Sequence, residues 1–499
     1  MKKVMMACAA LAVASVTTAY AGGMLTNTNQ NIAFLRNPAR DAAIGIDGVY
    51  SNPAGVAFLN DGWHLSLNWQ AAFQTRTVQT TSPYLDHNLS GNAVTKEYKG
   101  NAQAPFLPSI QLAKNTGRWS FQFNFSVTGG GGKCEFDKGL GSFESAVGQI
   151  GTMLQPLGVN GYDVDCYMQG KQYYFGFQLG AAYKITDNLS VFGGLRALYG
   201  TASYKAKIEN ILVSTASAGS MPFGTFIDAS NASLNSSLEQ VNAGIAQLDQ
   251  VIAMYGAATP HEYIAQREGL LTTQATLEST LGSIEQLEVY REGVNLQSDQ
   301  HGFGIAPVFG VDWKIGRFNL AGKYEFRTKM SMKNSSTVKE AMAIEAVNQF
   351  QDGTSIREDS PALLALGVQY SPVDIVRLNL GYHHFYDKQA KKYGNKQDLL
   401  EKGTNEYLGG VEVDLTDRLT VSAGGQLTRY GLSDEYMSDM SFVVNSCSLG
   451  FGAKYKVNPA VTLQAAYFKT LYEDYKTADL SNKFTRTNDV IGVGCDIEF

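Results

Sequence analysis

The sequence predicts an all-β, 14-stranded antiparallel transmembrane β-barrel with an N-terminal hatch and a helical extracellular loop, and three observations lead to this prediction. Charged residues make up only 17% of the chain, while glycine (51 residues), tyrosine (26) and phenylalanine (25) are abundant. Mean hydropathy is nonetheless only −0.15, as expected for strands that alternate apolar and polar side chains. Long alternating segments also recur from residue 63 to the end of the chain.

Composition and charge exclude several other classes of protein. No stretch after residue 20 reaches the ~18 consecutive apolar residues of a membrane-spanning helix. The net charge is −6 and no run of basic residues occurs, so the electrostatic signature of nucleic-acid binding is missing. We therefore expect outer-membrane lipid to surround this protein. We expect it not to bind nucleic acid.

Residues 1–21 have the pattern of a cleaved signal peptide. Lys2 and Lys3 precede an apolar stretch over residues 4–16, and Ala-Tyr-Ala at 19–21 fits a cleavage site. We expect export and a mature chain that begins at Gly22. Because Cys134 and Cys166 fall within one predicted loop of an exported protein, a disulfide between them is permitted, and the sequence leaves that question open.

Strands follow one another along the rest of the chain. Trp63, Leu65 and Leu67, for example, alternate with polar neighbours, which gives a strand one apolar and one polar face. Most of these segments exceed the ~9–11 residues of a tilted membrane strand, and their even number fits single-chain bacterial barrels. The fourteen predicted strands are 63–79, 103–114, 118–129, 171–184, 188–205, 301–315, 317–332, 357–371, 373–387, 403–416, 418–430, 441–456, 460–475 and 485–499.

The connections between these strands alternate strictly between short and long. The six short ones contain turn-forming residues such as Gly117, Gly316 and Pro372. Outer-membrane barrels have short periplasmic turns and longer outside loops, so both termini are expected in the periplasm. The predicted division is a signal peptide (1–21), a hatch or plug (22–60) and the barrel (61–499). The seven long connections are 80–102, 130–170, 206–300, 333–356, 388–402, 431–440 and 476–484.

The third outside loop, 206–300, is predicted to be helical. Leu234, Leu238, Val241, Ile245 and Leu248 step by three and four residues, the spacing of an apolar helix face. A second helix is predicted to end near residue 290. Either the two helices pack only on each other, or their apolar faces also guard a hydrophobic entrance.

Short motifs at both ends of the predicted hatch resemble those of a known family. Gly-Gly-Met-Leu stands at 22–25, Asn-Pro-Ala-Gly stands at 52–55 directly before the first strand, and ALLALGVQYSP spans 362–372. In these features the chain resembles the FadL family, outer-membrane transporters of long-chain fatty acids and other hydrophobic compounds. The last residue, Phe499, is also similar to the terminal signature of bacterial barrels, which implies the barrel assembly machinery as a partner.

The resemblance implies passive transport by a protein that we expect to be a monomer. Outside loops would capture a hydrophobic small molecule, which would reach a pocket near Met24 and Leu25. The hatch would then rearrange around Asn52, Pro53, Ala54 and Gly55. The cargo would leave sideways, beside a kinked third strand.

The third predicted strand runs into a glycine sequence, Gly129, Gly130 and Gly131, followed by Gly132. Glycine weakens a strand and permits bends, so these residues are candidates for a lateral gate. They fit the flexible start of a loop equally well.

Several charged residues fall on the lumen-facing phase of the predicted strands. Arg196, Lys323, Arg327 and Arg377 are the cationic ones, and Glu325, Glu412 and Asp414 accompany them. One cation could pair with a ligand carboxylate, or all of these groups could form a neutralising network inside the lumen.

Signals for enzyme chemistry are weak. His261 and Glu262 begin an H-E-x-x-H pattern, but Ala265 replaces the second histidine. We expect no metal, no cofactor and no catalytic residue. An outer-membrane enzyme would need a Ser-His pair, and no serine is positioned beside His384. The principal alternative to a transporter is a general porin-like or partner-binding barrel.

Overall fold

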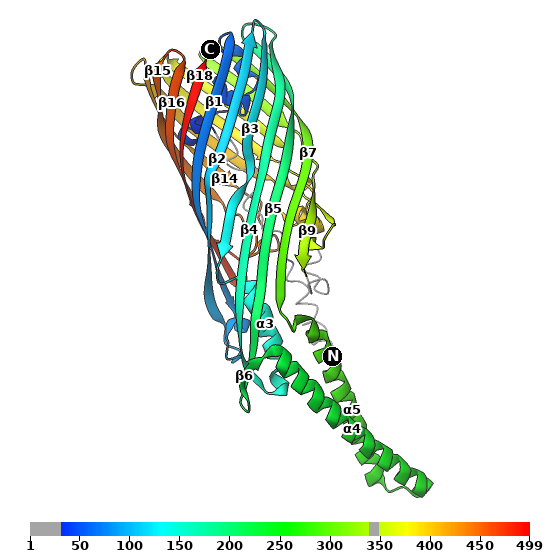
Figure 1. Cartoon of the computed structure of the whole chain (residues 1–499). Coiled ribbons are helices and arrows are strands. Elements are labelled where there is room, and N and C mark those ends of the chain that lie inside the picture. Colours follow the sequence, from blue (N-terminus) through cyan, green and yellow to red (C-terminus); the bar gives the residue numbers. More distant parts are fainter. Residues whose placement is uncertain (1–30, 339–348) are drawn as a thin grey trace.

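The computed structural model describes residues 31–338 and 349–499 and confirms the predicted closed antiparallel barrel (Figure 1). The wall closes where the first and last strands pair, with His64 opposite Glu498. The expected signal peptide, Met24 and Leu25 lie outside the described residues. The wall strands are β1 (Gly62–Ser82), β2 (Val94–Thr116), β3 (Trp119–Phe136), β4 (Val159–Lys184), β5 (Leu189–Thr215), β7 (Val294–Ile315), β8 (Phe318–Glu325), β11 (Leu363–Val373), β12 (Val376–Phe385), β13 (Thr404–Asp414), β14 (Leu419–Arg429), β15 (Ser446–Asn458), β16 (Val461–Tyr472) and β18 (Asn482–Glu498).

The outer face of the barrel is apolar and the inner face is polar. Leu179 is 63% exposed, whereas its neighbour Gln178 is 1% exposed. The same alternation holds for Phe121 and Gln122, which are exposed and buried, respectively. This arrangement is the reverse of a water-soluble sheet protein and fits strands whose outer face contacts lipid.

The two ends of the barrel differ, and we name them by their connections. The turn end carries the six short connections, as predicted, and the C-terminus lies there (Figure 1). Aromatic rings pair at this end: Trp63 stacks on Phe499 at 6.5 Å, and Trp119 lies 4.7 Å from Tyr183. Such rings form the interfacial girdle of a membrane barrel. The loop end is the opposite end.

Several strands extend further toward the loop end than their alternation predicted. The predicted strands 171–184 and 188–205 become β4 and β5, of 26 and 27 residues. The predicted loop 130–170 shrinks accordingly and contains an unpredicted helix, α3 (Gly141–Met153). The predicted strand 317–332 divides into β8 and β9 (Ser331–Val338), and the short strands β6 (Gly219–Pro222), β10 (Ser355–Arg357) and β17 (Tyr475–Lys476) complete the sheet.

The third long loop is helical, as predicted. Helices α4 (Phe223–Tyr255) and α5 (His261–Leu287) pack against each other and project from the loop end (Figure 1). At ~1.5 Å per residue, α4 is about 50 Å long. Among the described residues, no helix is long and apolar enough to cross a membrane.

Apolar side chains fill much of the interior nearer the loop end. One cluster gathers Tyr98, Phe136, Met168 and Phe350 with fifteen other buried residues. A second contains Val78, Met437, Phe442, Val444 and Phe484. The interior is therefore apolar in this part, although the inner face of the strands nearer the turn end is polar.

Cys134 and Cys166 are free thiols, so the disulfide that the sequence permitted is not formed. Both residues lie on strands rather than in one loop. Cys134 is paired in register with Gly170, four residues from Cys166 along β4. At ~3.3 Å per residue this offset is about 13 Å, beyond the ~7 Å between Cα atoms that a disulfide can span.

Candidate functional site

Residues 31–60, the described part of the predicted hatch, enter the barrel lumen near the turn end (Figure 1). We call them the hatch segment. It contains the short helix α2 (Ile32–Arg36) and two 3-10 turns, η1 (Ile46–Val49) and η2 (Gly55–Phe58). Helix α2 begins where the Asn31 side chain accepts a hydrogen bond from the Ala33 N–H at 2.8 Å, the ordinary N-cap interaction.

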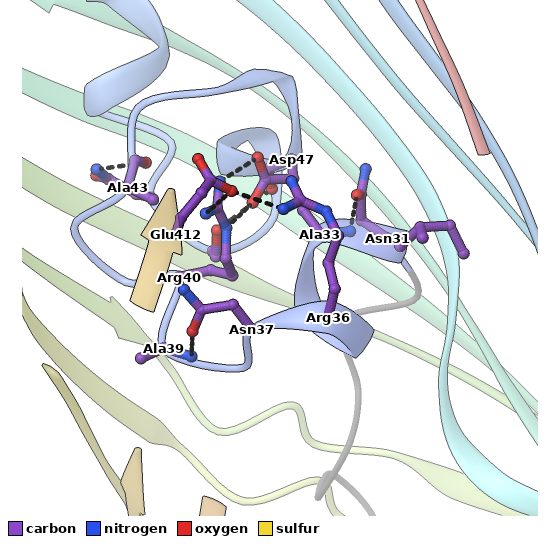
Figure 2. Close-up of polar contacts among 12 residues, drawn as sticks. Asn31, Ala33, Arg36, Asn37, Ala39, Arg40, Ala43, Asp47 and Glu412 are labelled. Carbon is purple, nitrogen blue, oxygen red and sulfur yellow. Dashed lines mark hydrogen bonds and ion pairs between the residues drawn. The ribbon is translucent and has the colours of Figure 1, made fainter. Parts of the chain in front are cut away.

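Two arginines of the hatch segment converge on one carboxylate of the wall (Figure 2). Arg36 donates to Glu412 on β13 at 2.6 Å, and Arg40 lies 3.9 Å from the same carboxylate. Arg40 also donates to Asp47 at 2.7 and 3.0 Å. Burial opposes the charge on Arg40, but Asp47 and Glu412 outweigh it and raise the pKa of the guanidinium, so this anchor stays ionised.

The predicted motif Asn52-Pro53-Ala54-Gly55 forms a second anchor. Asn52 donates to Asp312 on β7 at 2.5 Å, and its side-chain oxygen accepts from the Gly55 N–H at 3.2 Å. The carbonyls of Pro53 and Ala54 accept hydrogen bonds at 2.7 Å from Gln122 on β3 and Ser190 on β5, respectively. Asn52, Pro53 and Ala54 therefore hold the segment against the wall, and Gly55 closes the motif on the Asn52 side chain.

A buried histidine makes a third anchor. One ring nitrogen of His383 on β12 lies 2.8 Å from Asp41 of the hatch segment, and the other lies 2.9 Å from Glu406 on β13. Both partners are carboxylates and can only accept hydrogen bonds when ionised. The geometry therefore suits a doubly protonated, cationic ring between them.

Glycines on the inner wall allow the hatch segment to approach this closely. A Cβ at Gly450 would lie 2.0 Å from the Leu35 carbonyl oxygen, and one at Gly410 would lie 2.0 Å from the Asn37 side chain. At Gly367 it would lie 2.6 Å from the backbone of residue 42. Larger residues here would displace the segment.

The lumen charges that the sequence singled out have protein partners. Arg196 pairs with Glu325 and lies over the Tyr50 ring at 4.4 Å. Lys323 donates to the Tyr50 carbonyl at 2.8 Å. These groups hold a hatch residue and form part of a neutralising network.

The other two predicted cations are also paired. Arg377 pairs with Asp414 at 2.6 Å and Glu412 at 2.9 Å. Arg327 donates to the Gln389 carbonyl and lies 3.6 Å from Asp359. Of the two readings of these charges, the structure favours the network.

A break in the β-ladder separates β2 from β3. The two strands pair up to Gln103 opposite Lys133 and again from Ile110 opposite Phe125. Between these points, residues 104–109 and 126–132 have no partners across this seam. The predicted gate glycines Gly129, Gly130 and Gly131 lie within this break.

Both strands carry extra residues at the break. From Val127 to Gly132, β3 advances by five residues, whereas the paired stretch of β4 advances by three. Gly130 and Gly132 have φ values of +96° and +75°, which glycine adopts readily. Strand β2 bulges at Pro105 and Phe106, opposite β1. Proline has no N–H to donate to a ladder, and the sequence interpretation overlooked Pro105 and Pro108 as signals of the break.

A cavity of about 680 Å³ lies between the hatch segment and the wall at the turn end. Its lining is highly charged and includes Arg40, Asp47, Arg377 and Lys454. This chemistry suits water rather than an apolar molecule. Within the described ranges, no cluster of His, Cys, Asp and Glu side chains could hold a metal ion.

The comparisons with known proteins identify the fold. No protein-family model matches the sequence, and no curated protein matches it. A solved FadL homologue from Pseudomonas aeruginosa aligns with a TM-score of 0.61 and 14% identity, over 96% of this chain and 100% of the other. The toluene transporter TodX of P. putida aligns with a TM-score of 0.56 and 13% identity, over 96% and 99%.

A third solved structure, the Ralstonia pickettii toluene transporter TbuX, aligns with a TM-score of 0.52 and 14% identity, over 95% of this chain and 99% of that one. These structural alignments show a shared fold along nearly the whole chain, and at such low sequence identity they show the fold alone. Ligand and mechanism have to be argued from the residues of this chain.

Proposed function

We propose that this protein is a passive outer-membrane transporter for hydrophobic compounds. A molecule captured at the loop end would pass through the apolar part of the lumen to the hatch segment. It would leave sideways through the β2–β3 break after the hatch rearranges. The chain would act as a transporter and not as an enzyme.

The observation that carries this proposal is the position of the break relative to the apolar interior. Ala104 and Leu107, in the part of β2 that is not paired with β3, pack in one cluster with Phe34 and Leu35 of the hatch segment. An apolar molecule that reaches the hatch would therefore lie beside the discontinuous wall. Sideways exit into lipid avoids the unfavourable exposure of apolar surface to periplasmic water.

Long-chain fatty acids are our first candidate cargo, through the motifs shared with the FadL family. The likeness to two toluene transporters makes aromatic hydrocarbons the second candidate. The porin-like alternative is less well supported, because the hatch segment is bound to the wall by at least three separate anchors. An intact protein with a large ion conductance would overturn the plugged lumen.

The register suggests a variant in which the break is closed. Seven steps on β2, from Gln103 to Ile110, face eight on β3, from Phe125 to Lys133. Deleting Phe106 from β2 and residues 130 and 131 from β3 leaves six steps on each strand. The same deletions also equalise β2 with β1 and β3 with β4. The inward and outward faces of all four strands keep their phase.

Uptake of oleate and of toluene should be measured in cells that express the wild-type or the closed variant. We expect the closed variant to fold, to bind its cargo at the loop end and to lose uptake. A control variant with one extra glycine beside Gly117, in a turn, should transport normally. Undiminished uptake by a folded closed variant would rule out exit through this seam.

A further inference from the structure

Two arginines face each other across the seam that closes the barrel. Arg76 on β1 is directly opposite Arg486 on β18, and both lie on the inward phase of their strands. Arg76 is only 4% exposed. Like charges directly opposite in an antiparallel pair are destabilising, so this arrangement requires an explanation.

The described part of the chain supplies no anion to either side chain. Nε and Nη2 of Arg76, and Nε of Arg486, are buried without hydrogen-bond partners. The contacts of Arg486 are neutral: it donates to the Gln74 side chain at 3.3 Å and lies 4.9 Å from the Tyr472 ring. The lumen cations nearer the turn end differ, because Arg36, Arg196 and Arg377 each pair with a carboxylate.

The surroundings of the two guanidinium groups are apolar. On β1, Val78 follows Arg76 on the same face, and on β18 Phe484 precedes Arg486. Both belong to one apolar cluster. On the other side, Gly100 pairs with Arg76, and the Phe136 ring covers that glycine. The arginine pair thus lies between two apolar clusters of the lumen.

We propose that Arg76 and Arg486 bind the anionic head group of a single-chain amphiphile, whose apolar tail lies among the neighbouring clusters. A carboxylate or phosphate has the oxygens to accept hydrogen bonds from both guanidinium groups. Its charge offsets the repulsion between the two arginines. The inference rests on the proposed transport function and narrows the cargo to amphipathic anions.

Calorimetric binding of decanoate, decyl phosphate and 1-decanol to the purified protein tests this site. The titrations use a nonionic detergent and protein-free micelles as the blank. The test variant is Arg76→Gln with Arg486→Gln, which keeps polar side chains and removes both charges. The control is Arg429→Gln, which removes an arginine that already pairs with a carboxylate, that of Glu473 just beyond the end of β16. Heat-modifiable mobility on gels verifies that each barrel is folded.

We expect the double variant to bind the preferred anion roughly ten- to a hundredfold more weakly, as lost hydrogen bonds between charged groups predict. Binding of 1-decanol should not change, and R429Q should match wild type for all three probes. Whichever of decanoate and decyl phosphate binds the wild-type protein more tightly identifies a carboxylate or a phosphate as the preferred head group.

Equal binding of the anions by wild type and the folded double variant would overturn the site but leave the transport proposal intact if 1-decanol binds. Absence of binding for all three probes in the wild type would count against both proposals.

Discussion

Removing the charge of Glu412 should release the hatch segment from the wall. The carboxylate lies 2.6 Å from Arg36 and 3.9 Å from Arg40, both in the hatch segment. It also lies 2.9 Å from Arg377 and 3.4 Å from Lys454 on the wall. In Glu412→Gln these four cations lose their shared counter-charge while the side-chain volume is conserved.

The magnitude follows from burial. Arg36 and Glu412 are 2% and 5% exposed, and breaking such a buried pair costs about 3–5 kcal/mol. Because that interaction joins the hatch segment to the barrel, the lost free energy weakens the docking of the hatch segment. It raises the undocked fraction by roughly two to three and a half orders of magnitude, since ~1.4 kcal/mol corresponds to a factor of ten.

Trypsin offers a direct assay, because Arg36 and Arg40 are buried in the docked state. Cleavage after either residue, followed by mass spectrometry, should accelerate in Glu412→Gln in proportion to the undocked population. Asp414→Asn is the matched control, since Asp414 pairs with Arg377 at 2.6 Å and only on the wall. Equal cleavage rates in Glu412→Gln and wild type, or the same acceleration in the control, would refute this account of the anchor.

Three further predictions follow from single residues. Gly450→Ala should weaken hatch docking by about 1–3 kcal/mol through overpacking and raise tryptic cleavage, whereas Gly409→Ala, with a nearest contact of 3.7 Å, should not. Alkylation of the denatured, unreduced mature protein should modify all four cysteines, as measured by mass spectrometry of the product. A product that carries two alkyl groups fewer would point to a bridge between Cys134 and Cys166. Burial lowers the pKa of Lys396, in the loop after β12, from 10.5 to about 8, so the unfolded chain binds more protons between these values and stability should rise with pH from about 8 to 10.5. Lys396→Met should raise the melting temperature at pH 7 and flatten that rise, and an unchanged pH profile would contradict the assignment.

The fold follows from local patterns that the sequence carries directly. Each strand alternates apolar and polar residues over its own length, and each short turn contains its own glycine, asparagine, aspartate or proline. Helices α4 and α5 were predictable because their apolar spacing repeats every three to four residues. Strand ends were less predictable, since β4 and β5 continue beyond the membrane-length alternation as a ribbon that they form together.

The motif at 52–55 was found from the sequence, but its role as an anchor depends on Asp312, which lies 260 residues away. The glycine sequence 129–131 was equally visible. The alternative of a loop start is wrong, because β3 continues through it to Phe136. The break beside it depends on the register with β2, which no local pattern specifies.

The charged residues show most clearly what the sequence determines and what only the tertiary structure decides. The alternation of a strand places a side chain on the inner face, and this much the sequence determined for Arg196, Arg377 and their neighbours. Whether such a cation has a counter-ion depends on which strands and which hatch residues meet inside the closed barrel. Arg36 meets Glu412 across 376 residues of chain, whereas Arg76 meets another arginine. Only the closure of the sheet and the path of the hatch through it decided these partners, because electrostatic pairing depends on distance in space and not on separation along the chain.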